Sequence, residues 1–146
     1  MEPDERKKKV MEELMQVIRG EEEKAVRAFD TGATRSAESN KPDYEGFISP
    51  LVIEAYGRYM HGHRMQADGS VRDSDNWQKG IPFKDYMKSL LRHVFQLHRL
   101  HRGYPVTDWG TSRAVTFEEL LCAIIFNASG YLHEQIKLHE GFKSKF

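Results

Sequence analysis

The densest group of chemically useful side chains lies in the stretch DSDNWQKGIP, residues 73 to 82. It offers two carboxylates, an amide, an indole and an ammonium group, from Asp73, Asp75, Asn76, Trp77 and Lys79. Gly80 permits a positive φ and Pro82 suits the first turn of a helix, so the stretch is predicted to be a loop that opens a helix. The alternative is a plain surface turn, in which Asp and Asn bond their own backbone and Trp77 covers the core.

A second group of candidates lies on the helices that follow. Arg92 and His93 fall in the middle of a helix predicted from about Phe83 to His101. His93 shares a flank with Leu90 and Leu97, which is more typical of a hydrogen-bonded core histidine than of a catalyst.

The last predicted helix carries acids at its start and an amide in its interior. Thr116 is the expected N-cap, and Glu119 completes a capping box, which gives this acid a structural role. Asn127 interrupts the apolar run from Leu120 to Phe126. A buried amide needs a partner, so Asn127 must bond a backbone group, a side chain or a ligand.

The elements that must position these groups are helices. Apolar residues recur at helical spacing in four segments, which begin near Asp4, Ser49, Phe83 and Thr116. No run of alternating Val, Ile or Thr and no Asn-Gly hairpin indicates a strand. The sequence therefore predicts an all-α fold, a bundle of about four helices with long polar loops.

Two parts of the chain are expected to differ. Residues 1 to 29 form a charged amphipathic N-terminal helix, and residues 30 to 146 form a single helical domain that opens with a long polar loop over 30 to 46. On the helix from Phe83, the predicted buried stripe consists of Met87, Leu90, Leu91, Val94 and Phe95. Cys122 is predicted to be a small buried hydrophobe.

Composition excludes several classes of protein. The 146 residues carry 22 basic and 22 acidic side chains, and this balance argues against a partner that is a nucleic-acid polymer. The longest apolar run is far shorter than the ~20 residues of a membrane span. A charged N-terminus without a secretory signal and a single cysteine are typical of a cytoplasmic protein.

Five blocks carry a family resemblance, in this order along the chain: GATR (32 to 35), KPDYEGFISPLV (41 to 52), DNWQKGIP (75 to 82), SLLRH (89 to 93) and EELLCAIIFN (118 to 127). Together they resemble the phage proteins described as dATP/dGTP diphosphohydrolase-like, often by their N-terminal domain, which are associated with MazG-type all-α nucleotide pyrophosphohydrolases. The motif positions are Asp75, Asn76, Trp77, Gly80, Arg92, His93, Glu118, Glu119 and Asn127. One departure is Leu120, which stands where the last motif usually has His.

The resemblance implies metal-dependent hydrolysis of deoxypurine or purine nucleoside triphosphates to the monophosphate and pyrophosphate. Mg²⁺ (or Mn²⁺) would be held by Asp75, Glu118 and Glu119, with Glu119 and His93 as catalytic residues. The substrate would be bound by Asn76, Trp77, Lys79, Arg92 and Asn127. The MazG enzymes hold their metal on paired ExxE and ExxD helices, and Glu118 and Glu119 are the nearest acids here.

Three classes of function stay open at this point. The first is the nucleotide pyrophosphohydrolase, expected to be a homo-oligomer in a host cytoplasm. The second is a phage protein that binds and sequesters a nucleotide or nucleotide signal without turnover. The third is a structural or interaction protein with the charged N-terminal helix as its docking surface.

Overall fold

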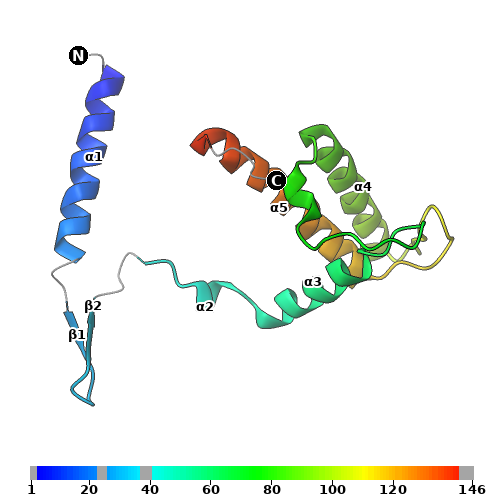
Figure 1. Cartoon of the computed structure of the whole chain (residues 1–146), viewed down its shortest axis with the longest axis horizontal. Coiled ribbons are helices and arrows are strands. Elements are labelled where there is room, and N and C mark those ends of the chain that lie inside the picture. The colour runs from blue at the N-terminus through cyan, green and yellow to red at the C-terminus, as the bar shows by residue number, and fades with distance from the viewer. Residues whose placement is uncertain (1–2, 23–25, 37–40, 142–146) are drawn as a thin grey trace. The chain divides into compact units, whose positions relative to one another are not determined.

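The computed structural model describes residues 3–22, 26–36 and 41–141 (Figure 1). Within these ranges the chain is mostly helical, which confirms the predicted all-α class. Contacts divide the chain into two units, Met1–Phe47 and Ile48–Phe146. Each unit is described separately below.

The first unit contains a helix, a hairpin and one further helical turn. Helix α1 spans Pro3–Glu22, strands β1 (Val26–Ala28) and β2 (Thr34–Ser36) pair antiparallel, and α2 covers Tyr44–Phe47. The predicted helix up to Phe29 is therefore too long, and the expectation of no strands is wrong here. A turn with Gly32 at φ 84° reverses the chain, and a strand of three residues on each side completes the hairpin.

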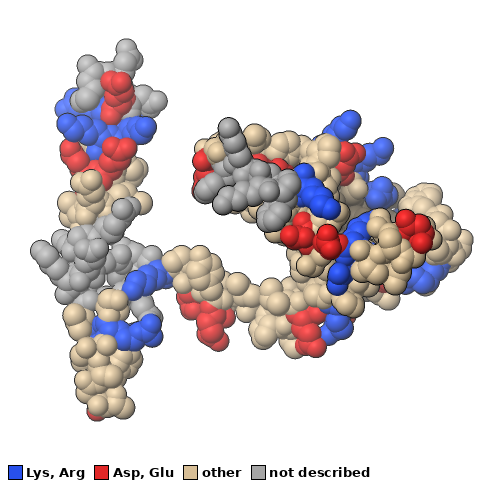
Figure 2. Space-filling model, in the orientation of Figure 1, with Lys and Arg blue, Asp and Glu red and all other residues tan. Residues whose placement is uncertain are grey.

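Helix α1 keeps its apolar side chains exposed. Val10, Met11, Leu14 and Met15 are all largely accessible to solvent. On the surface of α1, basic side chains form a band next to acidic side chains (Figure 2). Helix α1 is therefore amphipathic, as predicted from the sequence, but no described residue of this unit covers its apolar face.

The second unit is built on three helices: α3 (Pro50–Gly62), α4 (Phe83–His101) and α5 (Phe117–Glu140). Helix α4 packs along α5, and α3 contacts α5 as well (Figure 1). The short 3-10 helix η1 (Asn76–Lys79) precedes α4, and Gly80 follows it at φ 100°, as the sequence predicted.

Local signals set where these helices begin and end. The Ser49 hydroxyl accepts a hydrogen bond from the Val52 amide, with Pro50 at the first position of α3. Thr116 and Glu119 form the predicted capping box of α5. Helix α5 ends at Gly141 in the left-handed conformation, which Gly adopts without a Cβ clash.

The core lies between α4 and α5 and centres on one aromatic ring. Tyr86 of α4 is 1% exposed and lies directly against Gly130 of α5. Cys122 on α5 is also buried, as predicted. Asn127 is also buried, and its amide donates a 2.8 Å hydrogen bond to the Ala123 carbonyl, so its own helix backbone supplies the partner that the amide requires.

The predicted buried stripe of α4 is wrong. Four of its members are exposed by 39% to 61%, namely Met87, Leu91, Val94 and Phe95, and only Leu90 is half-buried. The helix instead buries Tyr86 and Gln96 against α5. The periodicity identified an apolar face of α4, but the face that carries Tyr86 is the one that packs against α5. The Tyr86 ring packs more closely there because it lies against a glycine.

None of the helices in the described ranges combines the length and the apolar character that a membrane crossing requires. Acidic and basic side chains both occur on the visible surface of the second unit (Figure 2).

Candidate functional site

Two cavities lie in the second unit. The first, called here the arginine cavity, has a volume of about 530 Å³. Its wall combines cations, imidazoles, carboxylates and aromatic rings, from Tyr59, His63, Arg92, His93, Gln96, Asp108, Trp109, Arg113, Val115, Glu119, Leu120 and Ala123. Its size is within the range of small-ligand sites, about 300 to 1,000 Å³.

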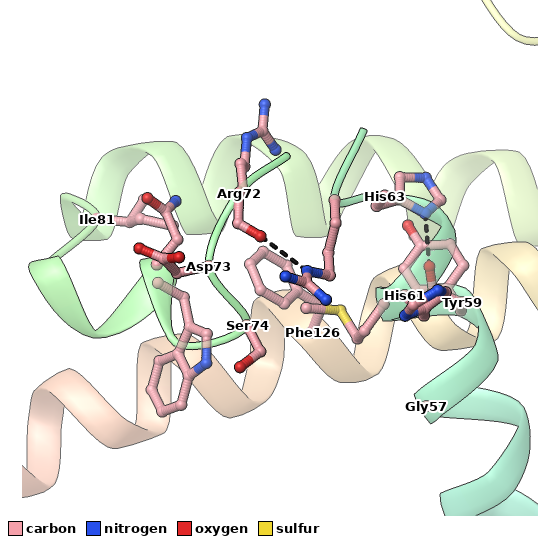
Figure 3. A pocket seen from close by; sticks show the side chains of 13 residues that line it. Gly57, Tyr59, His61, His63, Arg72, Asp73, Ser74, Ile81 and Phe126 are labelled. Carbon is pink, nitrogen blue, oxygen red and sulfur yellow. Dashed lines mark hydrogen bonds between the residues drawn. The ribbon is translucent and has the colours of Figure 1, made fainter. Parts of the chain in front are cut away.

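The second, called here the aromatic cavity, has a volume of about 430 Å³ (Figure 3). It is lined by Gly57, Tyr59, Met60, His61, His63, Arg64, Arg72, Asp73, Ser74, Asn76, Trp77, Ile81 and Phe126. Tyr59 and His63 line both cavities, and their ring centroids are 4.1 Å apart. The two cavities therefore share one wall.

The shared wall is fixed at the end of α3. Nδ1 of His63 donates to the Tyr59 carbonyl at 2.8 Å, which satisfies a carbonyl of the last helical turn. Burial, with a smaller effect of Cys122, raises the pKa of Tyr59 to about 12, so its hydroxyl keeps its proton at neutral pH.

A tight loop forms the outer wall of the arginine cavity. Val106 and Val115 bond through their backbones, and the Thr111 hydroxyl donates to Oδ2 of Asp108 at 3.0 Å. Ser112 closes the turn at φ 57°. The loop presents Trp109, which is 84% exposed, on the same wall as Arg113.

Glu119 joins this loop to α5. Its Oε1 lies 2.8 Å from Nη2 of Arg113, while Oε2 accepts a 2.9 Å hydrogen bond from the Thr116 amide. The hydrogen bond from the Arg113 guanidinium lowers the pKa of Glu119 most; burial opposes this effect, and the hydrogen bonds from Thr116 lower the pKa further. The carboxylate is therefore ionised at neutral pH, which a metal ligand must be.

Arg92 and His93 contribute from α4. Arg92 has only a long contact to the Ser89 hydroxyl, 3.4 Å, and no acid within ion-pair distance among the described residues. His93 is half-buried, and its Nδ1 lies 3.2 Å from Oε1 of Gln96, which suits Nδ1 as the donor. Burial lowers the pKa of His93, and the charge of Arg92 and the neighbouring His63 lower it further, whereas Gln96 raises it.

The lowered pKa of His93 predicts acid sensitivity. The folded state favours the neutral imidazole, so its contribution to the free energy of unfolding is complete above the unfolded pKa of about 6.5 and is lost as the pH falls through the folded pKa. Urea unfolding at pH 7.5 and at pH 5 should show a smaller loss of stability at pH 5 for His93→Gln than for the wild type. An equal loss in both proteins would assign the acid sensitivity to other groups.

The predicted site residues divide between the two cavities. Arg92, His93 and Glu119 line the arginine cavity, whereas Asn76 and Trp77 line the aromatic cavity. The other four residues line neither cavity: Asp75, Lys79, Glu118 and Asn127.

Of these four, Glu118 has an alternative partner. Its Oε1 lies 3.6 Å from Nη2 of Arg58 on α3. Asp75 precedes η1, and its backbone carbonyl accepts from the Gln78 amide.

The part of the chain that the structure describes contains no group of three or more His, Cys, Asp or Glu side chains arranged to hold a metal ion. Two carboxylates, Asp108 and Glu119, do line the arginine cavity together. Both oxygens of Glu119 already have partners, Arg113 and Thr116, and Oδ2 of Asp108 accepts the Thr111 hydrogen bond.

Asp108, Trp109 and Arg113 line the arginine cavity and were not among the site residues predicted from the sequence. They lie in the polar loop between α4 and α5, which contains Gly103, Pro105 and Gly110. Like residues 73 to 82, this loop combines acidic, basic and Trp side chains within a few positions. That composition was the sequence signal that could have identified these residues as candidates.

Comparison of the chain with protein-family models, with curated proteins and with solved structures found no match.

Proposed function

We propose that the Ile48–Phe146 unit binds a nucleoside polyphosphate, with the phosphates in the arginine cavity. The observation that carries the proposal is Arg92, a guanidinium on a cavity wall without an acidic partner among the described residues. Arg92 forms no ion pair with a described residue, and phosphate oxygens accept charge-assisted hydrogen bonds from guanidinium groups. The resemblance of five sequence blocks to diphosphohydrolase-like phage proteins supports the same ligand class.

Other groups of the cavity suit such a ligand. Arg113 also lines this cavity, and it keeps donors beyond its contacts with Glu119 and the Ala114 carbonyl. Trp109 offers an exposed aromatic face, and the Tyr59 hydroxyl is a permanent donor. We expect binding in the cytoplasm, where nucleoside triphosphates are available.

Hydrolysis of the ligand to a monophosphate and pyrophosphate is a second candidate function. The observation that favours it is the pair of carboxylates, Asp108 and Glu119, on the wall that also carries Arg92. They would hold Mg²⁺ or Mn²⁺, which would neutralise phosphate charge and supply a polarised water. His93 is a candidate proton acceptor, because its lowered pKa keeps the imidazole neutral at pH 7.

The test is a panel of dATP, dGTP, ATP, GTP and pyrimidine triphosphates, each with and without Mg²⁺ or Mn²⁺. Calorimetry measures binding, and a coupled assay measures pyrophosphate release. Binding with metal-dependent release supports the enzyme. Binding without release supports sequestration, and no binding of any triphosphate rejects both.

Asp108→Asn separates the two functions further. If the carboxylate holds a metal, pyrophosphate release should fall by about two orders of magnitude, as for the loss of a metal-positioning group. Metal-free binding should persist, because removing a negative charge does not weaken the attraction of an anion. Asp85→Asn, an acid on α4 that lines neither cavity, is the matched control.

We also propose that a second copy of the chain covers the exposed apolar stripe of α4. Leu91 in this stripe adjoins Arg92, so the interface would border the arginine cavity. A contiguous apolar face is costly in water and is typical of an interaction surface.

The oligomeric state tests this proposal. Light scattering at micromolar concentration should give a dimer or larger for the wild type and a monomer for Leu91→Glu. Leu132→Glu is the matched control, because Leu132 on α5 is exposed to a similar degree. A monomeric wild type, or an unaltered oligomer in Leu91→Glu, would contradict the proposal.

A further inference from the structure

We propose that the aromatic cavity is a guanine-binding site, with Asp73 and Asn76 as the groups that recognise the base. The inference rests on the proposed function to the extent that the phosphates of the same ligand would lie in the arginine cavity. The recognition of the base itself rests on separate residues and can be tested with ligands that lack phosphate.

The floor of the cavity suits a flat heteroaromatic ring. Phe126 of α5 lies behind the opening, with Ile81 towards one end and Tyr59 towards the other (Figure 3). Trp77 adds an indole, which a T-shaped contact to His133 holds at a centroid distance of 4.8 Å. Aromatic and aliphatic walls with a few polar groups at the rim are typical of sites for planar ligands.

The rim contains one carboxylate without a partner. Among the described residues, the Asp73 carboxylate accepts no hydrogen bond and forms no ion pair; only its backbone carbonyl is engaged, by the Asn76 amide N–H. The side-chain amide of Asn76 also lines the cavity. Two polar groups are therefore open to a ligand on the same rim.

The loop that carries Asp73 is held in place. Nε of Arg64 donates to the Arg72 carbonyl at 2.7 Å (Figure 3). The Arg72 backbone amide donates to the Arg64 carbonyl at 2.9 Å. A bridge between Met65 and Val71 closes the same loop. A residue directly after this clamp has a fixed approach to the cavity, which recognition of one base edge requires.

The chemistry of the two groups selects guanine. Its Watson–Crick edge presents an acceptor, O6, followed by two donors, N1–H and the exocyclic amine. An ionised carboxylate only accepts, so Asp73 matches the two donors, while the Asn76 amide donates to O6. Adenine presents one donor and one acceptor on this edge, and a carboxylate opposite the adenine N1 would face a lone pair.

The shared wall explains why one ligand would use both cavities. Tyr59 and His63 line the aromatic cavity on one side and the arginine cavity on the other. A nucleotide with its base against Phe126 would extend past this wall towards Arg92 and Arg113.

The experiment uses the full chain and calorimetric titration with guanosine, inosine and adenosine, and separately with inorganic tripolyphosphate. We expect guanosine to bind more tightly than inosine, which lacks the exocyclic amine, and more tightly than adenosine, each by about 10- to 100-fold. Asp73→Asn should lose most of the preference for guanosine over inosine and leave tripolyphosphate binding unchanged. Asp85→Asn should preserve both preferences.

The outcomes separate the two proposals. Equal binding of guanosine, inosine and adenosine, or a guanosine preference that survives in Asp73→Asn, would overturn the guanine site. If tripolyphosphate binds and guanosine does not, the phosphate site stands and the guanine site fails. If guanosine binds and tripolyphosphate does not, the proposed polyphosphate function fails alone.

Discussion

Replacing Gly130 by Ala should destabilise the protein by about 3 kcal/mol, the upper end of the range for overpacking a core. A Cβ at this position would overlap the Cε1 and Cζ atoms of the Tyr86 ring. The ring cannot retreat easily, because Tyr86 is almost fully buried and contacts Phe126 at a centroid distance of 6.0 Å. Urea unfolding followed by circular dichroism measures the change.

Gly57→Ala is the matched control for this substitution. Gly57 is also a helical glycine, but a Cβ built there meets no atom within 4 Å. Alanine should therefore be neutral or stabilise the protein by up to about 1 kcal/mol through helix propensity. The double variant with Tyr86→Leu should recover part of the stability that Gly130→Ala loses, and equal stability of Gly130→Ala and Gly57→Ala would contradict the packing described for α4 and α5.

Arg92→Gln should weaken the binding of a nucleoside triphosphate by about 10- to 100-fold. A hydrogen bond to a charged group contributes about 1.5 to 3 kcal/mol, and Arg92 has no acidic partner among the described residues that would otherwise use its charge. The loss should shrink at high salt, because screening weakens the wild-type interaction first. Titration calorimetry at two salt concentrations measures both effects.

Arg99→Gln tests whether the effect is specific. Arg99 lies on the same helix and lines neither cavity, and replacing it by Gln removes the same charge. The affinity of this variant for the triphosphate should stay within about twofold of the wild type. Similar losses in both variants would indicate a general effect of net charge and would remove Arg92 from the site.

The sequence predicted the helices well where the signal was local. Ser49-Pro50 and the Thr116–Glu119 capping box set helix starts through contacts within four residues, so no knowledge of the tertiary structure was needed. The hairpin of β1 and β2 was missed because its turn lacks the Asn-Gly signal and each strand has only three residues.

The packing could not be predicted in the same way. Helix α4 has an apolar stripe of the expected period, yet Tyr86, beside Gly130, is what the structure buries. The choice between two faces of one helix depends on a glycine more than forty residues later in the chain, and periodicity carries no such information.

The candidate site was predicted in part for the same reason. Arg92, His93 and Glu119 lie on helices, and their common cavity follows from the packing of α4 along α5. Asp108 and Arg113 come from a loop whose shape depends on backbone bonds and on Ser112 at a positive φ. A positive φ is uncommon for serine, so the sequence did not indicate this turn.

The chain has two tryptophans, and the structure assigns one to each cavity. Trp77 is half-buried beside His133, while Trp109 is largely exposed, so the two indoles differ in their surroundings. The protein therefore has one intrinsic fluorophore in each cavity. In Trp109→Phe the remaining emission reports on the aromatic cavity, and in Trp77→Phe it reports on the arginine cavity, so the two halves of one ligand could be followed as they arrive.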